Sequence, residues 1–452
     1  MVDSADANES TARSRPLKRL LGPTTAFLVG LGVAVGSGIF RTPAPTAAAF
    51  GSVSGIVLAW IFGGLFVVAS GLVTAELATR FPRAGGEYVY LREAYGEFPA
   101  FFFGWSYTVF IIGGGAGTIG AACGEVLVQL LSWPEHTAKP LATAIVVMVV
   151  LINVAGLKAG AAWQNALTVI KLAALVGVAA IGFAAGEAPL DWSQPVLPAG
   201  GAVAFLAALP PVLWAYDGTT DTSKLAEEVA DVRRALPRAL VGSALTLTVL
   251  YVVVNLACLS VLPPASIAQH KFALSAAMGA VLGPAGERGI TAISLVVFLG
   301  SLSSTLLATV RVTFALGRDG LAPAAFGRMS AAQSPIAAYI AVGTIAALFT
   351  WYRGFTEILD IYFLAASILF GLAYGSLIVF RMRDARTGGF PAYAFRCPGG
   401  PVLSLLLIVV QLAFGATIVV NSPADSLRTL VLLAVLGFAY VLIRRFKPTA
   451  SD

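Results

Sequence analysis

Charged side chains, histidine and cysteine are all scarce in this sequence. Only 12% of the 452 residues are charged, whereas 58% are hydrophobic, which is far outside the composition of a soluble protein. The two histidines, His136 and His270, are far apart, and the three cysteines show no ligand or disulfide spacing. No metal, cofactor or disulfide framework is therefore predicted. The absence of a Ser/His/Asp or Cys/His constellation also argues against an enzyme.

Apolar windows long enough to cross a bilayer, about 20 residues each, recur along the whole chain. We therefore predict an all-α polytopic membrane protein with twelve transmembrane helices. The windows are 24–48, 52–78, 98–131, 140–157, 162–185, 200–220, 238–262, 289–316, 334–350, 357–380, 401–420 and 427–443. Residues 1–23 are charged and lack a cleavage site after an apolar stretch, so they are predicted to be a cytoplasmic tail rather than a signal peptide. Residues 444–452 form the second predicted tail.

Lys and Arg are unevenly divided between the two sides of this arrangement. With the N-terminus inside, the inner segments hold 22 of the 29 and the outer segments hold five; the others are Arg41 at a helix end and Lys171 within a span. Such an excess marks the cytoplasmic side. We therefore expect a multi-pass protein of the cell membrane with both termini in the cytoplasm. The net charge of +6 reflects this topology and gives no reason to expect nucleic acid as a partner.

Helix breakers interrupt two spans at corresponding places. The first span contains Gly36-Ser37-Gly38, which has weak helix propensity. The sixth contains Pro210-Pro211 and then Trp214-Ala215-Tyr216-Asp217-Gly218. The two spans are five helices apart, so they run in opposite directions, and matched breaks in two inverted halves are typical of a transport site at the membrane midplane. Close helix packing is the alternative role for glycine, and it is the role predicted for Gly113-Gly114-Gly115.

Four groups of motifs follow one another along the chain. They are Gly36-Ser37-Gly38-Ile39-Phe40 with Pro43; Ala75-Glu76-Leu77 with 81–91 and Phe103-Gly104-Trp105; Trp214 to Gly218 with Glu227-Glu228-Val229 and Leu236-Pro237-Arg238-Ala239; and Arg311 with Gly317-Arg318-Asp319-Gly320-Leu321 and Pro323. In this order and spacing the chain resembles the amino acid-polyamine-organocation (APC) superfamily, within its bacterial permeases related to the L-type amino acid transporters. The resemblance implies a leucine-transporter-like fold and an amino-acid substrate. It places one five-helix repeat at 24–185, a second, inverted repeat at 200–380, and two further helices at 401–443.

A free amino acid matches the chemistry of the two breaks. Unwinding at Gly36-Ser37-Gly38 frees N–H groups at a positive helix end, where a carboxylate is favoured. Unwinding from Ala215 to Gly218 frees carbonyls, which suit an ammonium. The predicted substrate-binding residues are Val35, Gly36, Ser37, Gly38, Ile39, Trp214, Ala215, Tyr216 and Asp217.

Two of these side chains have more than one predicted role. By the resemblance, Trp214 is an aromatic gate that covers bound substrate from outside; an ordinary packed aromatic is the alternative. Asp217 is an intramembrane carboxylate and hence a functional candidate. Three roles are open for its carboxylate: it favours a cationic substrate, it binds a proton, or it caps exposed amides of the broken helix.

Lys171 lies within the fifth predicted span, where a lysine is costly and usually faces the protein interior. By the resemblance, its ammonium replaces the second sodium ion of sodium-coupled relatives and rests on helix-one carbonyls and helix-eight hydroxyls. Ser301 and Ser304 supply those hydroxyls and share a helix face at i, i+3. Lys171, Ser301 and Ser304 are the predicted proton-coupling residues, because a buried ammonium can release and rebind a proton. Snorkelling to the inner surface is the alternative.

Charged residues that flank the predicted inner loops have no expected substrate contact. Glu76, Arg83, Glu87, Arg92 and Glu93 are predicted to form gate or folding ion pairs. Glu227 and Glu228 are expected to pair with inner-loop arginines.

The leading functional prediction is a secondary active amino-acid transporter that works by alternating access, as a proton symporter or an exchanger. An amino-acid sensor on a transporter scaffold is the alternative. The outer loop from Ser132 to Pro140 lacks the cysteine by which animal relatives bond a heavy chain, so no disulfide-linked partner is expected. The particular amino acid and the oligomeric state stay open.

Overall fold

The computed structural model describes residues 17–155, 157–352 and 355–446, so most of the two predicted tails lies outside the described residues. The described chain is helical, and its one β-bridge joins Leu21 to Val229. The elements are α2 (Pro23–Ala34), α3 (Ser37–Arg41), α4 (Pro43–Phe50), α5 (Val53–Arg80), α6 (Glu87–Tyr95), α7 (Glu97–Ser106), η1 (Tyr107–Gly114), α8 (Gly115–Leu131), η2 (Glu135–Thr137), α9 (Ala138–Val154), α10 (Leu157–Ala185), α11 (Gly201–Ala207), α12 (Pro210–Tyr216), η3 (Asp221–Glu228), α13 (Val232–Val261), α14 (Pro264–Ile267), α15 (Ala273–Arg318), η4 (Ala324–Gly327), α16 (Ile336–Tyr352), α17 (Phe355–Thr387), α18 (Gly400–Asn421) and α19 (Pro423–Phe446). The prediction of an all-α chain is confirmed.

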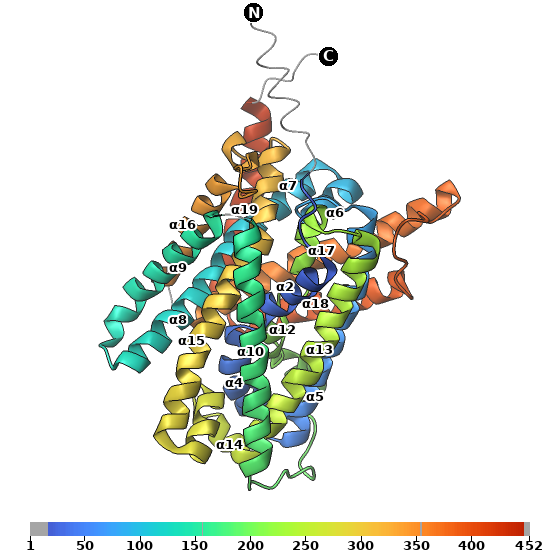
Figure 1. Cartoon of the computed structure of the whole chain (residues 1–452). Helices are drawn as coiled ribbons and strands as arrows, with labels where there is room; N and C mark the ends of the chain where they lie inside the picture. Colours follow the sequence, from blue (N-terminus) through green and yellow to red (C-terminus); the bar gives the residue numbers. More distant parts are fainter. Residues whose placement is uncertain (1–16, 156, 353–354, 447–452) are drawn as a thin grey trace, which may run out of the picture.

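Ten of the twelve predicted windows correspond to helical segments that are long and apolar enough to cross a membrane. The sixth window is a bent pair, Gly201–Ala207 and Pro210–Glu228, with 45° between its two parts. The ninth is a shorter apolar helix, Ile336–Trp351. The long helices pack side by side in Figure 1, and the described chain is that of a multi-pass membrane protein.

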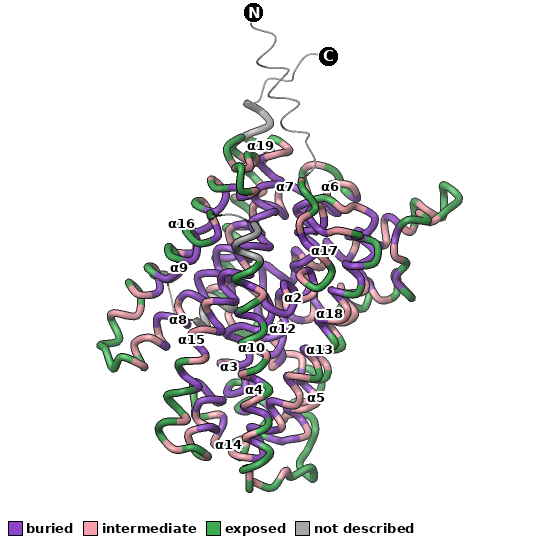
Figure 2. The backbone as a smooth tube through the Cα atoms, viewed as in Figure 1, coloured by how far each residue is buried: buried purple, intermediate pink, exposed green. Residues whose placement is uncertain are grey.

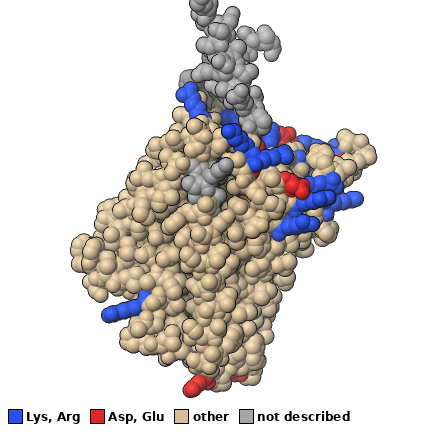
Figure 3. Space-filling view, in the orientation of Figure 1, with Lys and Arg blue, Asp and Glu red and all other residues tan. Residues whose placement is uncertain are grey.

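The surface of this bundle is apolar over most of its height. Large hydrophobic side chains such as Leu65, Leu151 and Val420 are exposed on its outer helices, and Figure 2 shows the exposed residues on the outward sides of α9, α10 and α16. Figure 3 shows Lys and Arg gathered at the end where α6 and α7 lie, with few charges over the middle. This distribution suits a protein whose middle contacts lipid.

Both predicted helix breaks are present, and each is narrower than the sequence suggested. In the first span α2 ends at Ala34 and α3 begins at Ser37, so only Val35 and Gly36 leave the helix and Gly38 is helical. In the sixth span α12 continues through Ala215 and Tyr216 and ends before Asp217. Gly218 then has a φ of +89°, a conformation that favours glycine, and the chain continues as the 3₁₀-helix η3.

The third span has an irregular centre that the sequence did not predict. Between α7 and α8 the residues Tyr107–Gly114 form a π-helix, η1. Such π-helical turns are rare and often occur at functional sites. Here the π-helix lies next to the two broken spans and turns Tyr107 and Ile111 toward them.

Candidate functional site

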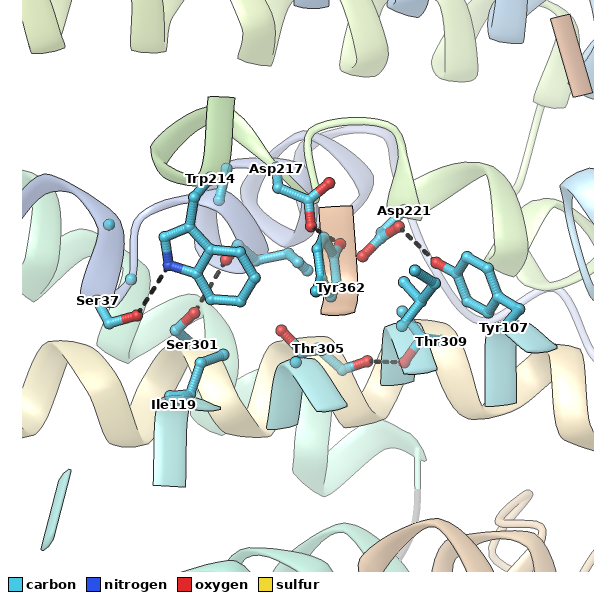
Figure 4. A pocket seen from close by; sticks show the side chains of 16 residues that line it. Ser37, Tyr107, Ile119, Trp214, Asp217, Asp221, Ser301, Thr305, Thr309 and Tyr362 are labelled. Atoms are coloured by element: carbon cyan, nitrogen blue, oxygen red, sulfur yellow. Dashed lines mark hydrogen bonds between the residues drawn. The ribbon is translucent and has the colours of Figure 1, made fainter. Parts of the chain in front are cut away.

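A small cavity lies where the two helix breaks face each other (Figure 4). It offers about 40 Å³ to the centres of water molecules, which is room for about three waters. Its lining comes from five spans: Val33, Ala34, Gly36, Ser37, Gly38, Tyr107, Ile111, Gly115, Ile119, Trp214, Asp217, Asp221, Ser301, Thr305, Thr309 and Tyr362. The cavity therefore joins helix-break residues to side chains from the third, eighth and tenth spans.

The predicted substrate-binding residues divide into two groups. Gly36, Ser37, Gly38, Trp214 and Asp217 line the cavity. Val35, Ile39 and Ala215 are buried outside its lining. Tyr216 points away, since its hydroxyl donates to the Trp60 carbonyl at 2.9 Å.

Trp214 covers one end of the cavity. Its indole Nε1 donates to Ser37 Oγ at 3.3 Å, and its ring meets the Tyr362 ring edge to face, with 5.0 Å between centroids. The Tyr362 hydroxyl in turn donates to Asp217 Oδ2. Ser37, Trp214, Tyr362 and Asp217 thus form one connected group of side chains from the first, sixth and tenth spans.

The glycines at the breaks permit close approach of protein to protein. A Cβ at Gly38 would lie 2.4 Å from Ala215 Cα, and one at Gly36 would lie 2.3 Å from Ser301 Oγ. Atoms this close overlap, so a side chain at either position requires neighbouring helices to move. Gly38 therefore meets a packing requirement between α3 and α12, in addition to the weak helix propensity that marks the break in the sequence.

Gly115 has a role beyond the helix packing expected for the glycine triplet. It lines the cavity, and a Cβ there would lie 3.5 Å from the Tyr362 ring and 4.0 Å from the Trp214 ring. A larger residue at this position would therefore fill space at the centre of the site.

The last four carbonyls of α2 are all satisfied, three of them by other helices. A helix end leaves four carbonyls without intrahelical partners. Here the Val35 amide donates to Leu31, and the other donors are Lys171 Nζ to Gly32 at 2.8 Å, Ser301 Oγ to Val33 at 3.0 Å, and the Tyr251 hydroxyl to Ala34 at 3.0 Å. Helices α10, α13 and α15 thereby hold the broken end.

Lys171 is fully buried and reaches the carbonyl of Gly32 rather than the inner surface. Its position also suits the negative end of the α2 dipole. Gly300 of α15 leaves space for it, because a Cβ there would lie 3.0 Å from Nζ. Within the described chain, neither predicted serine bonds to Lys171: Ser301 caps Val33, and Ser304 donates to the Gly300 carbonyl of its own helix at 2.6 Å.

The cavity face of α15 begins at Ser301 and continues through Thr305 and Thr309. These residues are spaced by four, so they share one face of the helix. Sequence reasoning missed the two threonines because Ser304, at a spacing of three, is an equally plausible neighbour on the sequence alone.

A buried ion triplet lies at the other end of the cavity, and of its three members the sequence analysis named only Glu87 as an ion-pair residue. Lys224 Nζ lies 2.7 Å from Asp221 Oδ1 and 2.9 Å from Glu87 Oε2. Asp221 additionally accepts a long hydrogen bond of 3.4 Å from the Tyr107 hydroxyl. Asp221 and Lys224 follow the second break in a stretch that the sequence placed in an inner loop, and only the turn of η3 brings them inside.

Most of the loop charges singled out in the sequence pair at the end of the molecule that carries α6 and α7. Arg83 pairs with Glu93, and Arg92 with Asp319. Glu228 accepts two hydrogen bonds from Arg311, at 2.9 and 3.2 Å. Glu227 pairs with Arg318 at 3.0 Å and also accepts the backbone amides of Leu17 and Ala84. Glu227 and Glu228 therefore each pair with an arginine, as predicted, but the partner of Glu228 lies within helix α15 rather than in a loop.

These features define a multi-pass membrane protein with a small cavity, lined by both polar and apolar side chains, between two broken helices. The sequence profile of the amino acid permease family matches residues 21–443. The chain therefore belongs to the amino acid permease family, which confirms the resemblance drawn from the four motif groups. This membership also indicates a transporter rather than an enzyme.

Characterised relatives match over most of the chain. It is 27% identical to the serine/threonine exchanger SteT of Bacillus subtilis, over 95% of this chain and 98% of that protein. It is 28% identical to the branched-chain amino acid permease BcaP of the same bacterium, over 89% of each. It is 25% identical to the mouse b(0,+)-type amino acid transporter 1, over 84% of this chain and 79% of that protein.

Proposed function

We propose that this protein is a secondary active transporter that carries amino acids across the cell membrane by alternating access, by proton symport or by exchange. The observation that carries the proposal is the cavity between the two breaks, in a chain whose family is that of amino acid permeases. The names of the relatives, an exchanger for serine and threonine and a permease for branched-chain amino acids, support the substrate class.

In this proposal the substrate carboxylate binds at Gly36-Ser37-Gly38, where α3 begins and the helix dipole is positive. The α-ammonium binds at the end of α12, near its terminal carbonyls and Asp217. Trp214 covers the bound amino acid, and its hydrogen bond to Ser37 links that cover to the carboxylate site. Val35, Ile39, Ala215 and Tyr216 act by shaping the two breaks rather than by touching the substrate.

We assign proton coupling to Lys171, with Ser301 beside it on the broken end of α2. Their side chains cap adjacent carbonyls, Gly32 and Val33, so a change in the charge of Lys171 alters the stability of that helix end. Ser304 supports this site through packing, because its hydroxyl bonds within α15.

The proposed architecture has twelve spans, with the bent sixth span and the short ninth helix both included. Repeats at 24–185 and 200–380 are inverted relative to each other, and helices at 401–443 complete the chain. Both termini are placed in the cytoplasm. The gathering of Lys and Arg at one end of the molecule (Figure 3) supports this orientation.

Transport by purified protein in proteoliposomes tests the proposal. Radiolabelled amino acids are offered with and without an imposed pH gradient, and with and without amino acids inside. Saturable uptake driven by the gradient indicates symport, and uptake that requires internal substrate indicates exchange. Absence of saturable flux under every condition, from protein that is folded and inserted, would refute the transport proposal.

A further inference from the structure

The buried charges beside the cavity do not balance. Lys224, Asp221 and Glu87 have side chains that are 0%, 9% and 4% exposed, and they contain one ammonium for two carboxylates. Asp217 adds another carboxylate nearby, and its hydrogen-bond partner is the neutral hydroxyl of Tyr362. The wall formed by the sixth span and α6 therefore holds an excess of negative charge.

Buried charge without compensation is costly, because the ions lose their hydration and gain no partner in return. A zwitterionic amino acid supplies one ammonium, which matches Asp217, and one carboxylate, which matches the start of α3. The triplet of Glu87, Lys224 and Asp221 would keep its excess negative charge beside such a substrate. A further positive charge is needed to balance the occupied site.

The triplet faces the cavity through one residue. Asp221 lines the cavity, whereas Lys224 and Glu87 lie behind it. Hydroxyls of Tyr107, Thr305 and Thr309 line the same region, and hydroxyl oxygens accept hydrogen bonds from an ammonium. Figure 4 shows Asp221 and Ser37 on opposite sides of the cavity, with Trp214 and Tyr362 between them.

We propose that Asp221 binds the cationic side chain of the substrate, so that the protein prefers amino acids with a second, positively charged nitrogen. This inference rests on the proposed function and on the placement of the carboxylate at Gly36-Ser37-Gly38. A substrate held there by its α-groups extends its side chain toward Asp221. The cavity volume of about 40 Å³ favours a short side chain over a long or aromatic one.

The carboxylate of Asp221 can serve Lys224 and the substrate together. A carboxylate has two oxygens and about four acceptor positions, and Lys224 contacts Oδ1. Substrate binding therefore adds a partner without breaking the existing ion pair, and the four charges of the filled triplet sum to zero.

Matched substrate pairs test this preference in proteoliposomes. 2,3-Diaminopropionate is compared with serine, and 2,4-diaminobutyrate with homoserine, at slightly acidic pH where the second amine is charged. Each pair differs only in an ammonium or a hydroxyl. Because a hydrogen bond to a charged group is worth more than a neutral one, we expect the wild-type protein to favour the diamino member by about tenfold or more in kcat/KM.

Asp221→Asn should remove this preference and bring the two members of each pair to within about twofold. Asp425→Asn is the matched control, since Asp425 pairs with Arg428 on α19 away from the cavity, and it should leave the ratio unchanged. Size-exclusion profiles verify that both variants fold. If Asp221→Asn does not fold, the ratio of kcat/KM between the two members of each pair, measured on the wild-type protein, still tests the preference for a cationic side chain.

A wild-type preference for serine and homoserine would overturn the proposal. So would an Asp221→Asn protein that keeps the wild-type ratio, or one that changes only the pH dependence of transport, because the latter result makes Asp221 a proton site. Failure of the transport function itself would look different, since neither member of any pair would then show saturable flux.

Discussion

Replacement of Gly38 by alanine tests the crossing of the two broken helices. The added Cβ would lie 2.4 Å from Ala215 Cα and 3.0 Å from the Ala215 amide nitrogen. Ordinary contacts between such atoms begin near 3.4 Å, so α3 and α12 must separate by about 1 Å. The atoms in the way belong to the backbone, and rotation of a side chain cannot relieve the overlap.

Overpacking of this kind costs about 1–3 kcal/mol. We therefore expect Gly38→Ala to lower the melting temperature of the purified protein. The rate of transport should also fall strongly, even if the protein stays folded, because a shift of about 1 Å is large for a cavity of only about 40 Å³. Thermal unfolding in detergent and initial rates of uptake in proteoliposomes measure the two effects.

Gly177→Ala is the control for this substitution. Gly177 lies within α10, and apart from its own neighbouring helix backbone no atom lies within 4 Å of the position of its Cβ. Alanine there should preserve transport and leave stability equal or slightly higher, because alanine has the better helix propensity. If Gly38→Ala behaved like Gly177→Ala in both assays, the close contact between α3 and α12 would not be a requirement of the native state.

Three further substitutions or reactions test other parts of the structure. Lys171→Met removes the donor to Gly32 and should abolish accumulation driven by a pH gradient; full accumulation would exclude proton coupling through Lys171. Glu228→Ala removes the carboxylate partner of the buried Arg311 and leaves it only the hydroxyl of Tyr339, which should cost about 3–5 kcal/mol and appear as a lower melting temperature. An unchanged melting temperature would contradict a stabilising buried ion pair. Burial raises the pKa of Cys397, in the loop before α18, to about 12, so its thiol should resist maleimide at neutral pH until the protein unfolds; rapid labelling of the native protein would show that it is accessible.

The spans and their order could be predicted because lipid imposes a simple requirement on the sequence. A helix that crosses a bilayer needs a continuous apolar stretch, and the chain has few charges to interrupt one. Two spans depart from this simple pattern: the sixth is divided by its 45° bend, and the ninth is an apolar helix that is shorter than the others. The narrowness of the breaks was not predictable, since glycine permits a break without setting its length.

The site was predicted best where backbone chemistry dominates. Gly36-Ser37-Gly38 and Asp217 line the cavity as expected, because breakers mark the places where helices open. Tyr362, Thr305 and Asp221 were missed, since the rotation of each helix about its own axis decides which side chains face the cavity. In a hydrophobic helix packed on several sides, no strong apolar stripe reveals that rotation.

The sequence by itself determined that the protein lies in a membrane, which spans are broken, and which family it belongs to. These properties follow from local composition and from motifs whose order is fixed along the chain. Only the tertiary structure decided which carbonyl of α2 each of Lys171, Ser301 and Tyr251 caps, and that Lys224 lies inside, between Asp221 and Glu87. Apart from the pairing of Asp221 with Lys224, which are three residues apart, those contacts join residues far apart in sequence. They depend on how each helix is placed and rotated against its neighbours.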